Sequence, residues 1–129
     1  MEPQFIAAVA LGGAVGSVAR YLVGIGSGIL FGMAFPWGTL IINITGSFLI
    51  GTFIGLFALK WNLPQVAKIF LTVGICGGYT TFSALSLDAW SLIERGQTMT
   101  SIFYMVASVT LSVSALIAAL LLVRLPVVN

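Results

Sequence analysis

At the centre of this chain lies the stretch Gly74-Ile75-Cys76-Gly77-Gly78-Tyr79-Thr80-Thr81-Phe82-Ser83, and the architecture depends on what this stretch does to a helix. It interrupts an apolar segment that runs from about residue 66 to residue 93. A helix that begins near residue 66 rises about 16 Å by Cys76, so the Gly77-Gly78 pair falls near the middle of the segment. Glycine and the β-branched threonines after it weaken a helix. The pattern therefore predicts a helix that breaks near its midpoint.

The composition around this stretch is typical of a membrane protein. Of the 129 residues, 60% are hydrophobic and 6% are charged, and the mean hydropathy is +1.18. A water-soluble domain keeps about a quarter of its residues charged, which excludes an ordinary globular domain. The absence of His and the single Cys76 exclude a Cys/His zinc site and a Ser-His-Asp triad, so we expect no enzyme. The few charges form no basic stripe, so we expect no nucleic-acid partner.

Four segments are long and apolar enough to cross a bilayer, whose hydrocarbon core of about 30 Å needs roughly 20 helical residues. The connections between them are short, so none of them holds a soluble domain. The chain is therefore predicted to be one all-α, four-helix transmembrane domain over residues 1–129. Its predicted spans are residues 5–31, 36–59, 66–93 and 98–123.

The basic residues indicate how the spans are oriented. An even number of spans places both termini on one side, together with Lys60, Lys68 and Arg124, whereas Arg95 and the long-stemmed Arg20 belong to the other side. Because this bias is small, we expect the chain to insert in both orientations. Four short helices are too few to enclose a wide aqueous path, so we expect an oligomer, and mixed orientation allows an antiparallel homodimer.

The predicted break has a chemistry of its own. Backbone that leaves a helix inside a membrane must be buried in protein or line a cavity, and the carbonyls at the end of a half-helix suit a hard cation. In an antiparallel pair, the carbonyls of Gly77 and Thr80 from both chains would surround one Na⁺ on the two-fold axis. The competing interpretation is that the Gly77-Gly78 pair only lets two helices pack closely.

Polar side chains follow two of the predicted helices. Along residues 36–59 they recur every four positions, and along residues 98–123 they recur every three or four positions, which places each set on one helical face. Asn43 in the first set either joins helices or donates its NH₂ group to a passing ligand. Serines also bond to their own helix, but their alignment favours a narrow wet path. The two sets are Thr39, Asn43, Ser47, Gly51 and Gly55, and Ser101, Tyr104, Ser108 and Ser112.

The chemistry of such a path favours an anion. Its donors are neutral hydroxyls and an amide, and no ring of carboxylates is available to attract cations. Phe82 adds an aromatic ring whose edge is electropositive. Arg20 marks either an entry vestibule or an interfacial anchor.

At this point the motifs resemble those of a known family. The chain is similar to the Fluc (CrcB) family of bacterial fluoride ion channels over almost its whole length. The matching runs are GGAVGSVARY at residues 12–21, WGTLIINITGSF at residues 37–48 and GICGGYTTFS at residues 74–83.

The resemblance implies a dual-topology antiparallel homodimer in a bacterial inner membrane, through which fluoride leaves the cytoplasm passively. It implies a central structural Na⁺ on the backbone carbonyls of Gly77 and Thr80, which conduction requires. Asn43 would hydrogen-bond to the permeating ion, Phe82 would present its ring edge, and Arg20 would lie near a vestibule. The other pore residues that the resemblance implies are Thr39, Ser83, Tyr104, Ser108 and Ser112.

One position departs from the family pattern. The second pore phenylalanine is replaced by Leu85, which keeps the apolar bulk but has no electropositive ring edge. We therefore expect Leu85 to impair fluoride flux.

Two other classes of protein fit parts of the sequence. A small dual-topology proton-coupled exporter needs a titratable carboxylate in the membrane, and no acid occurs between Glu2 and Asp88. A passive membrane scaffold would use Asn43 and the serines only to fasten helices. Flux separates them, because a channel dissipates a fluoride gradient without protons, an exporter needs a pH gradient and a scaffold moves nothing.

Overall fold

The computed structural model describes residues 2–128, with side chains up to residue 125, and all secondary-structure elements in this range are helices. Four helical stretches are long and apolar enough to cross a membrane, which confirms the predicted all-helical class. The first is α1 (Pro3–Phe31), the second is α2 (Trp37–Leu59) and the last is α6 (Thr98–Val128). The third consists of α3 (Gln65–Ile69), the π-helical segment η1 (Phe70–Cys76), α4 (Gly77–Tyr79) and α5 (Phe82–Glu94).

Local sequence explains where these helices begin and end. Proline is favoured in the first turn of a helix, where its missing N–H has no intrahelical partner, and Pro3 opens α1. Gly32 ends α1 with a φ of 80°, a conformation that glycine adopts at little cost. The last span was predicted to end near Val123, but α6 continues to Val128. Pro126 lies in this last part, where its missing N–H leaves the carbonyl of Leu122 without its helical donor.

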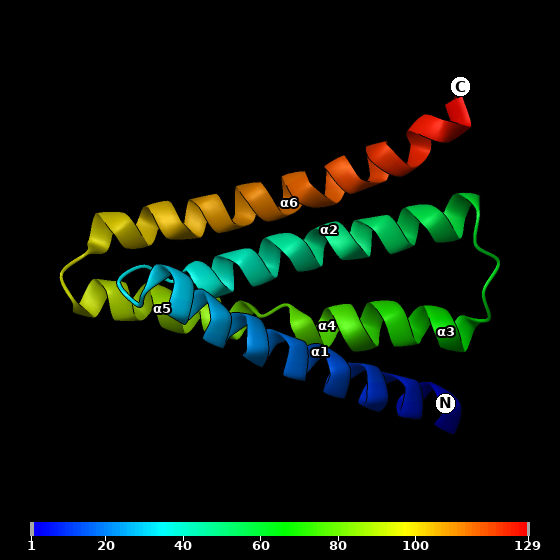
Figure 1. Cartoon of the computed structure of the whole chain (residues 1–129), viewed down its shortest axis with the longest axis horizontal. Coiled ribbons are helices and arrows are strands. Elements are labelled where there is room, and N and C mark those ends of the chain that lie inside the picture. The colour runs from blue at the N-terminus through cyan, green and yellow to red at the C-terminus, as the bar shows by residue number, and fades with distance from the viewer. Residues whose placement is uncertain (1, 129) are drawn as a thin grey trace.

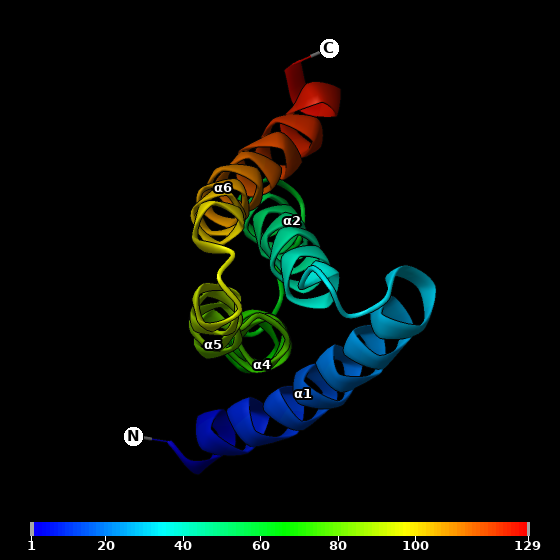
Figure 2. The same cartoon turned by 90° about the vertical axis from the view of Figure 1, so that its left-hand side faces the viewer.

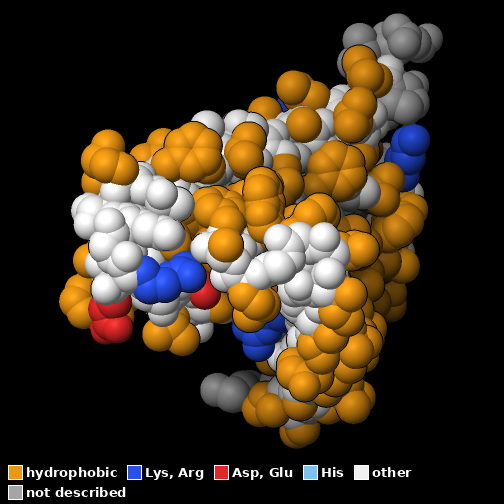
Figure 3. All heavy atoms as spheres, turned by 60° about the vertical axis from the view of Figure 1, so that its left-hand side comes forward, with side chains coloured by type: hydrophobic (Ala, Val, Ile, Leu, Met, Phe, Trp, Pro, Cys, Tyr) orange, Lys and Arg blue, Asp and Glu red, His pale blue; other side chains and the backbone are white. Residues whose placement is uncertain are grey.

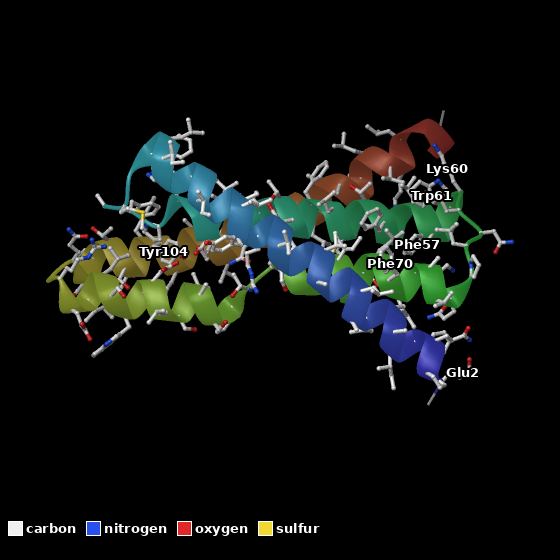
Figure 4. The ribbon with its side chains drawn as sticks, turned by 60° about the horizontal axis from the view of Figure 1, so that its bottom comes forward. Glu2, Phe57, Lys60, Trp61, Phe70 and Tyr104 are labelled. Atoms are coloured by element: carbon white, nitrogen blue, oxygen red, sulfur yellow. The ribbon has the colours of Figure 1, made fainter. Side chains whose placement is uncertain are left out.

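The four stretches run alternately up and down. Both termini and the α2–α3 connection lie at one end of the molecule, and the α1–α2 and α5–α6 connections lie at the other (Figure 1). Helix α2 packs chiefly against α6, whereas α1 crosses η1 and α4 (Figure 2). Glu2, Lys60 and Trp61 lie at the end that carries both termini, while Tyr104 lies toward the opposite end (Figure 4).

The outer surface is apolar. Hydrophobic side chains cover most of the face in Figure 3, and the few charged side chains form small, separate patches. Ile29 and Leu30 are 79% and 77% exposed. Such a continuous apolar surface is unsuited to water and matches the hydrocarbon core of a bilayer.

Close helix contacts depend on small residues. A Cβ added to Gly12 would lie 2.6 Å from the carbonyl oxygen of Phe70, and one added to Gly78 would lie 2.7 Å from the carbonyl oxygen of Gly13. Backbones that approach this closely leave no room for a side chain, so glycine is required where α1 crosses η1 and α4. On the other side, a buried cluster of Leu40, Leu85, Ala89, Leu92 and Tyr104 joins α2, α5 and α6.

Candidate functional site

The site is organised around two extended residues between α4 and α5. Thr80 has φ −77° and ψ 154°, and Thr81 has φ −152° and ψ 115°. The glycines that precede them are helical, and Gly77 has φ −64° and ψ −38°. The departure from helix therefore lies at the β-branched threonines, while Gly78 provides the close approach of α1.

The segment before these threonines is wound more widely than an α-helix. The N–H of Gly77 donates to the carbonyl of Thr72, the i→i−5 pattern of a π-helix. The N–H and the hydroxyl of Thr80 both donate to the carbonyl of Cys76, at 3.0 Å each. These bonds terminate the first half of the third stretch.

Asn43 on α2 joins the two extended residues to a neighbouring helix. Its Nδ2 donates to the carbonyl of Thr81 at 3.0 Å, and its Oδ1 accepts from the N–H of Thr81 at 2.8 Å. Two hydrogen bonds of the Asn43 side chain thus join α2 to the third stretch, as the helix-joining interpretation expected. An amide NH₂ group has two N–H bonds, so one remains for a ligand.

This pairing redirects two backbone donors away from their helical acceptors. In an unbroken helix the N–H of Thr81 would bond to the carbonyl of Gly77, but here it donates to Asn43. The N–H of Ala84 would bond to the carbonyl of Thr80, but it donates to Oγ1 of Thr81 at 3.0 Å, which caps α5. The carbonyls of Gly77 and Thr80 therefore lack their helical donors.

Two grooves lie on either side of the extended residues. The α1 groove, of about 910 Å³, lies between the second half of α1, the start of α2, and α5, and the predicted vestibule residue Arg20 lines it with Thr39. The α6 groove, of about 660 Å³, lies between α2, the third stretch and α6. Thr81 lines both grooves.

The α6 groove contains most of the predicted pore residues. Asn43, Phe82, Ser108 and Ser112 line it, as do Gly77 and Thr80, and none of the described residues that line it is charged. The hydroxyls of Ser108 and Ser112 are buried and have no hydrogen-bond partner in the described part of the chain. A buried hydroxyl without a partner costs about 1–3 kcal/mol, so a group that accepts these hydrogen bonds would be stabilised here.

Three predicted residues lie outside this groove. Thr39 lines the α1 groove, and Ser83 on α5 lies 3.3 Å from the hydroxyl of Thr81. Tyr104 is fully buried and donates to the carboxylate of Asp88 at 3.0 Å. The residues predicted to form one polar route are therefore distributed over two grooves and a buried contact within the single chain.

Sequence reasoning missed several polar contacts of this region. Asp88 on α5 lines the α1 groove with Arg95 and accepts the hydrogen bond of Tyr104. The hydroxyls of Thr45 and Tyr79 lie 2.8 Å apart, 34 residues apart in sequence. Spacing along one helix carries no signal for such contacts between helices.

Side-chain carboxylates and thiols do not form a metal-binding cluster in the described part of the chain. Within the described residues, no group of three or more His, Cys, Asp or Glu side chains is close enough to hold a metal. A cation here would need backbone oxygens, which hard ions such as Na⁺ accept. The carbonyls of Gly77 and Thr80 have the appropriate chemistry.

Four membrane-capable helices and an uncharged, mostly apolar groove that contains Asn43, Ser108 and Ser112 define a multi-pass membrane protein with a few polar groups between its helices. A family described as CrcB-like protein, Camphor Resistance (CrcB), matches residues 7–120. The chain therefore belongs to the CrcB-like family, which confirms the family indicated by its motifs.

Proteins similar to this chain are named as channels. One from Nitrobacter hamburgensis, named Fluoride-specific ion channel FluC 1, is 67% identical over 124 residues, which cover 96% of this chain and 98% of that protein. One from Nitrobacter winogradskyi, named Fluoride-specific ion channel FluC, is 65% identical over 124 residues with the same shares. One of the same name from Agrobacterium fabrum is 54% identical over 119 residues, 92% of this chain and 95% of that protein. These names describe ion channels rather than enzymes.

Proposed function

We propose that this chain is a fluoride-specific ion channel that lets fluoride leave the bacterial cytoplasm passively. The observation that carries the proposal is that the hydroxyls of Ser108 and Ser112, in the same groove as Asn43, have no hydrogen-bond partner among the described residues. Fluoride is a small anion that accepts strong hydrogen bonds, and a charged partner strengthens such a bond about twofold. The relatives of this chain that are named fluoride-specific ion channels also support the proposal.

Each residue of the α6 groove has a role in this proposal. The free N–H of Asn43 and the hydroxyls of Ser108 and Ser112 donate to the ion in place of water. Phe82, which is 75% exposed on the single chain, presents its electropositive ring edge to the same ion. Since none of the described lining residues is charged, the ion is bound without a strong counter-charge and can leave again.

The remaining predicted residues belong to the approach to this groove. Arg20 attracts the anion to the α1 groove, where Thr39 offers a hydroxyl. Thr81 lines both grooves, and Ser83 lies against its hydroxyl, so these two residues connect the approach to the pore. Tyr104, held by Asp88, supports the wall between them.

We also propose that the functional unit is an antiparallel homodimer in the bacterial inner membrane. Lys60, Lys68 and Arg124 lie in or beside the α2–α3 connection and the C-terminal part of α6, at the end with the termini, and Arg95 lies in the α5–α6 connection at the other end. The small difference in basic charge supports insertion in both orientations. The large exposed apolar surface supplies area for a second copy as well as for lipid.

A structural Na⁺ belongs to the proposed dimer. The carbonyls of Gly77 and Thr80 lack their helical donors, so they fit a hard cation, and the same atoms of an inverted copy would complete the ligand set. The bound ion would supply a fixed positive charge that holds the two copies together. Asn43 contributes to this site by engaging the N–H of Thr81 and so leaving the carbonyl of Gly77 free.

Fluoride efflux from proteoliposomes, followed with a fluoride-selective electrode at equal pH on both sides, tests the proposal. A channel empties the vesicles of fluoride and retains chloride. If efflux requires an imposed pH gradient, the protein is a proton-coupled exporter. If no fluoride leaves, the passive-scaffold interpretation is correct.

A further inference from the structure

Thr45 and Tyr79 form a contact between α2 and the third helical stretch, just before the extended residues. Their hydroxyl oxygens lie 2.8 Å apart. Oγ1 of Thr45 also lies 2.7 Å from the carbonyl of Ile41 on its own helix. A hydroxyl has one proton, and that of Thr45 goes to Ile41, so Tyr79 is the donor to Thr45.

Gly46, the next residue on α2, lies in close contact with Tyr79 and Thr80. A Cβ added to Gly46 would overlap the Cγ2 of Thr80 and lie 3.0 Å from Cδ2 of Tyr79. Gly46 is buried, so α2 lies directly against both residues. A glycine at this position is required by the close approach.

These contacts surround Thr80, whose carbonyl lacks its helical hydrogen-bond donor. The N–H and hydroxyl of Thr80 are fixed by Cys76, but its carbonyl lacks the donor that a helix would supply. Asn43 fixes the following residue, Thr81, from the same helix α2. Helix α2 therefore bonds to the residues on both sides of Thr80, to Tyr79 through its hydroxyl and to Thr81 through its backbone.

We propose that Thr45, Gly46 and Tyr79 form a clamp that sets the position of the Thr80 carbonyl, and that they are positioning residues for the cation bound there. This inference rests on the proposed Na⁺ site. Gly46 lines the α6 groove with Ser108 and Ser112, whereas Thr45 and Tyr79 do not line it. Loss of the clamp weakens sodium binding because the carbonyl is then free to move.

The test uses two changes that each remove one hydroxyl, Thr45→Val and Tyr79→Phe, and a matched control, Thr52→Val. Thr52 lies on the same helix and donates to the carbonyl of Phe48 at 2.9 Å, so the control removes the same kind of local bond without the contact to Tyr79. Detergent-purified protein is heated at increasing NaCl, with N-methyl-D-glucamine chloride keeping ionic strength constant. Because the stabilisation grows as RT ln(1 + [Na⁺]/Kd), a fit of Tm against NaCl concentration gives Kd, the sodium concentration that measures binding.

We expect Thr45→Val and Tyr79→Phe each to raise this sodium concentration about threefold, the factor that an average hydrogen bond between membrane helices provides. The double variant should be no worse than either single one, because both remove the same bond. Thr52→Val should leave the sodium concentration unchanged. A purely structural contact would lower Tm equally with and without sodium and leave the fitted sodium Kd unchanged, which would overturn the clamp.

The control and the wild type separate this inference from the function on which it rests. An equal effect of Thr52→Val would attribute the shift to the local helix bond and also overturn the clamp. A wild-type Tm that does not depend on sodium concentration would overturn both the proposed Na⁺ site and the clamp. Fluoride efflux by the wild type is measured separately, so failure of conduction is distinguished from failure of sodium binding.

Discussion

Asn43 and Thr81 exchange two hydrogen bonds across 38 positions of sequence, at 3.0 and 2.8 Å. One side chain thereby replaces a helical hydrogen bond at the point where the third stretch becomes extended. The exchange leaves the Gly77 carbonyl without its helical donor and leaves one amide N–H at the wall of the α6 groove. A single amide thus connects the proposed cation site with the proposed pore.

Substitution of two serines of α6, Ser108 and Ser101, should affect fluoride conduction and protein stability separately. Ser108→Ala removes a hydroxyl that has no partner in the described chain, so unfolding in detergent should be unchanged while fluoride efflux slows about tenfold. Ser101→Ala is the matched control, because the Ser101 hydroxyl is buried and donates to the carbonyl of Ala89 at 2.8 Å. It should cost about 1 kcal/mol of stability and leave efflux unchanged. Equal efflux for the wild type and Ser108→Ala would remove Ser108 from the pore.

The adjacent glycines should differ in their tolerance of a methyl group. Gly78→Ala would place a Cβ 2.7 Å from the backbone of Gly13, whereas a Cβ at Gly77 meets nothing closer than 3.7 Å. Thermal unfolding should therefore show a loss of about 1–3 kcal/mol for Gly78→Ala and little or none for Gly77→Ala. A similar loss at both positions would contradict the packing of α1 against α4.

Leu85→Phe should increase fluoride flux and leave assembly unchanged. Leu85 lines the α6 groove, and a phenylalanine ring extending into it would add a second electropositive edge near Phe82. Leu87→Phe is the control, because Leu87 lies on the same helix but is 65% exposed and does not line that groove. Efflux rates are compared after size-exclusion chromatography has established equal oligomeric state. Equal rates for the wild type and the Leu85→Phe variant would show that the ring edge makes no contribution.

The helices could be predicted from sequence because length and apolarity alone determine what can span a bilayer. The predicted bounds of α1 and α2 agree within two residues with Pro3–Phe31 and Trp37–Leu59. The family could also be predicted, since three motifs with fixed spacing carry it.

The contacts of the site were beyond the reach of sequence patterns. Periodicity placed Asn43 on a polar face, but it could not show that both ends of the amide engage Thr81 on another stretch. It also placed Tyr104 in line with Ser108, whereas the buried Tyr104 hydroxyl bonds to Asp88. Helix spacing determines which residues share a face and leaves open which helix that face meets.

The most direct test of the account is the passive fluoride efflux of Asn43→Ala, measured with a fluoride-selective electrode on proteoliposomes that contain sodium. Asn62→Ala, in the exposed connection between α2 and α3, makes the same chemical change outside the site. We predict that Asn43→Ala reduces efflux at least about tenfold, the effect of losing a hydrogen bond to a charged group, while Asn62→Ala conducts like the wild type. Wild-type efflux from a correctly assembled Asn43→Ala protein would contradict the account.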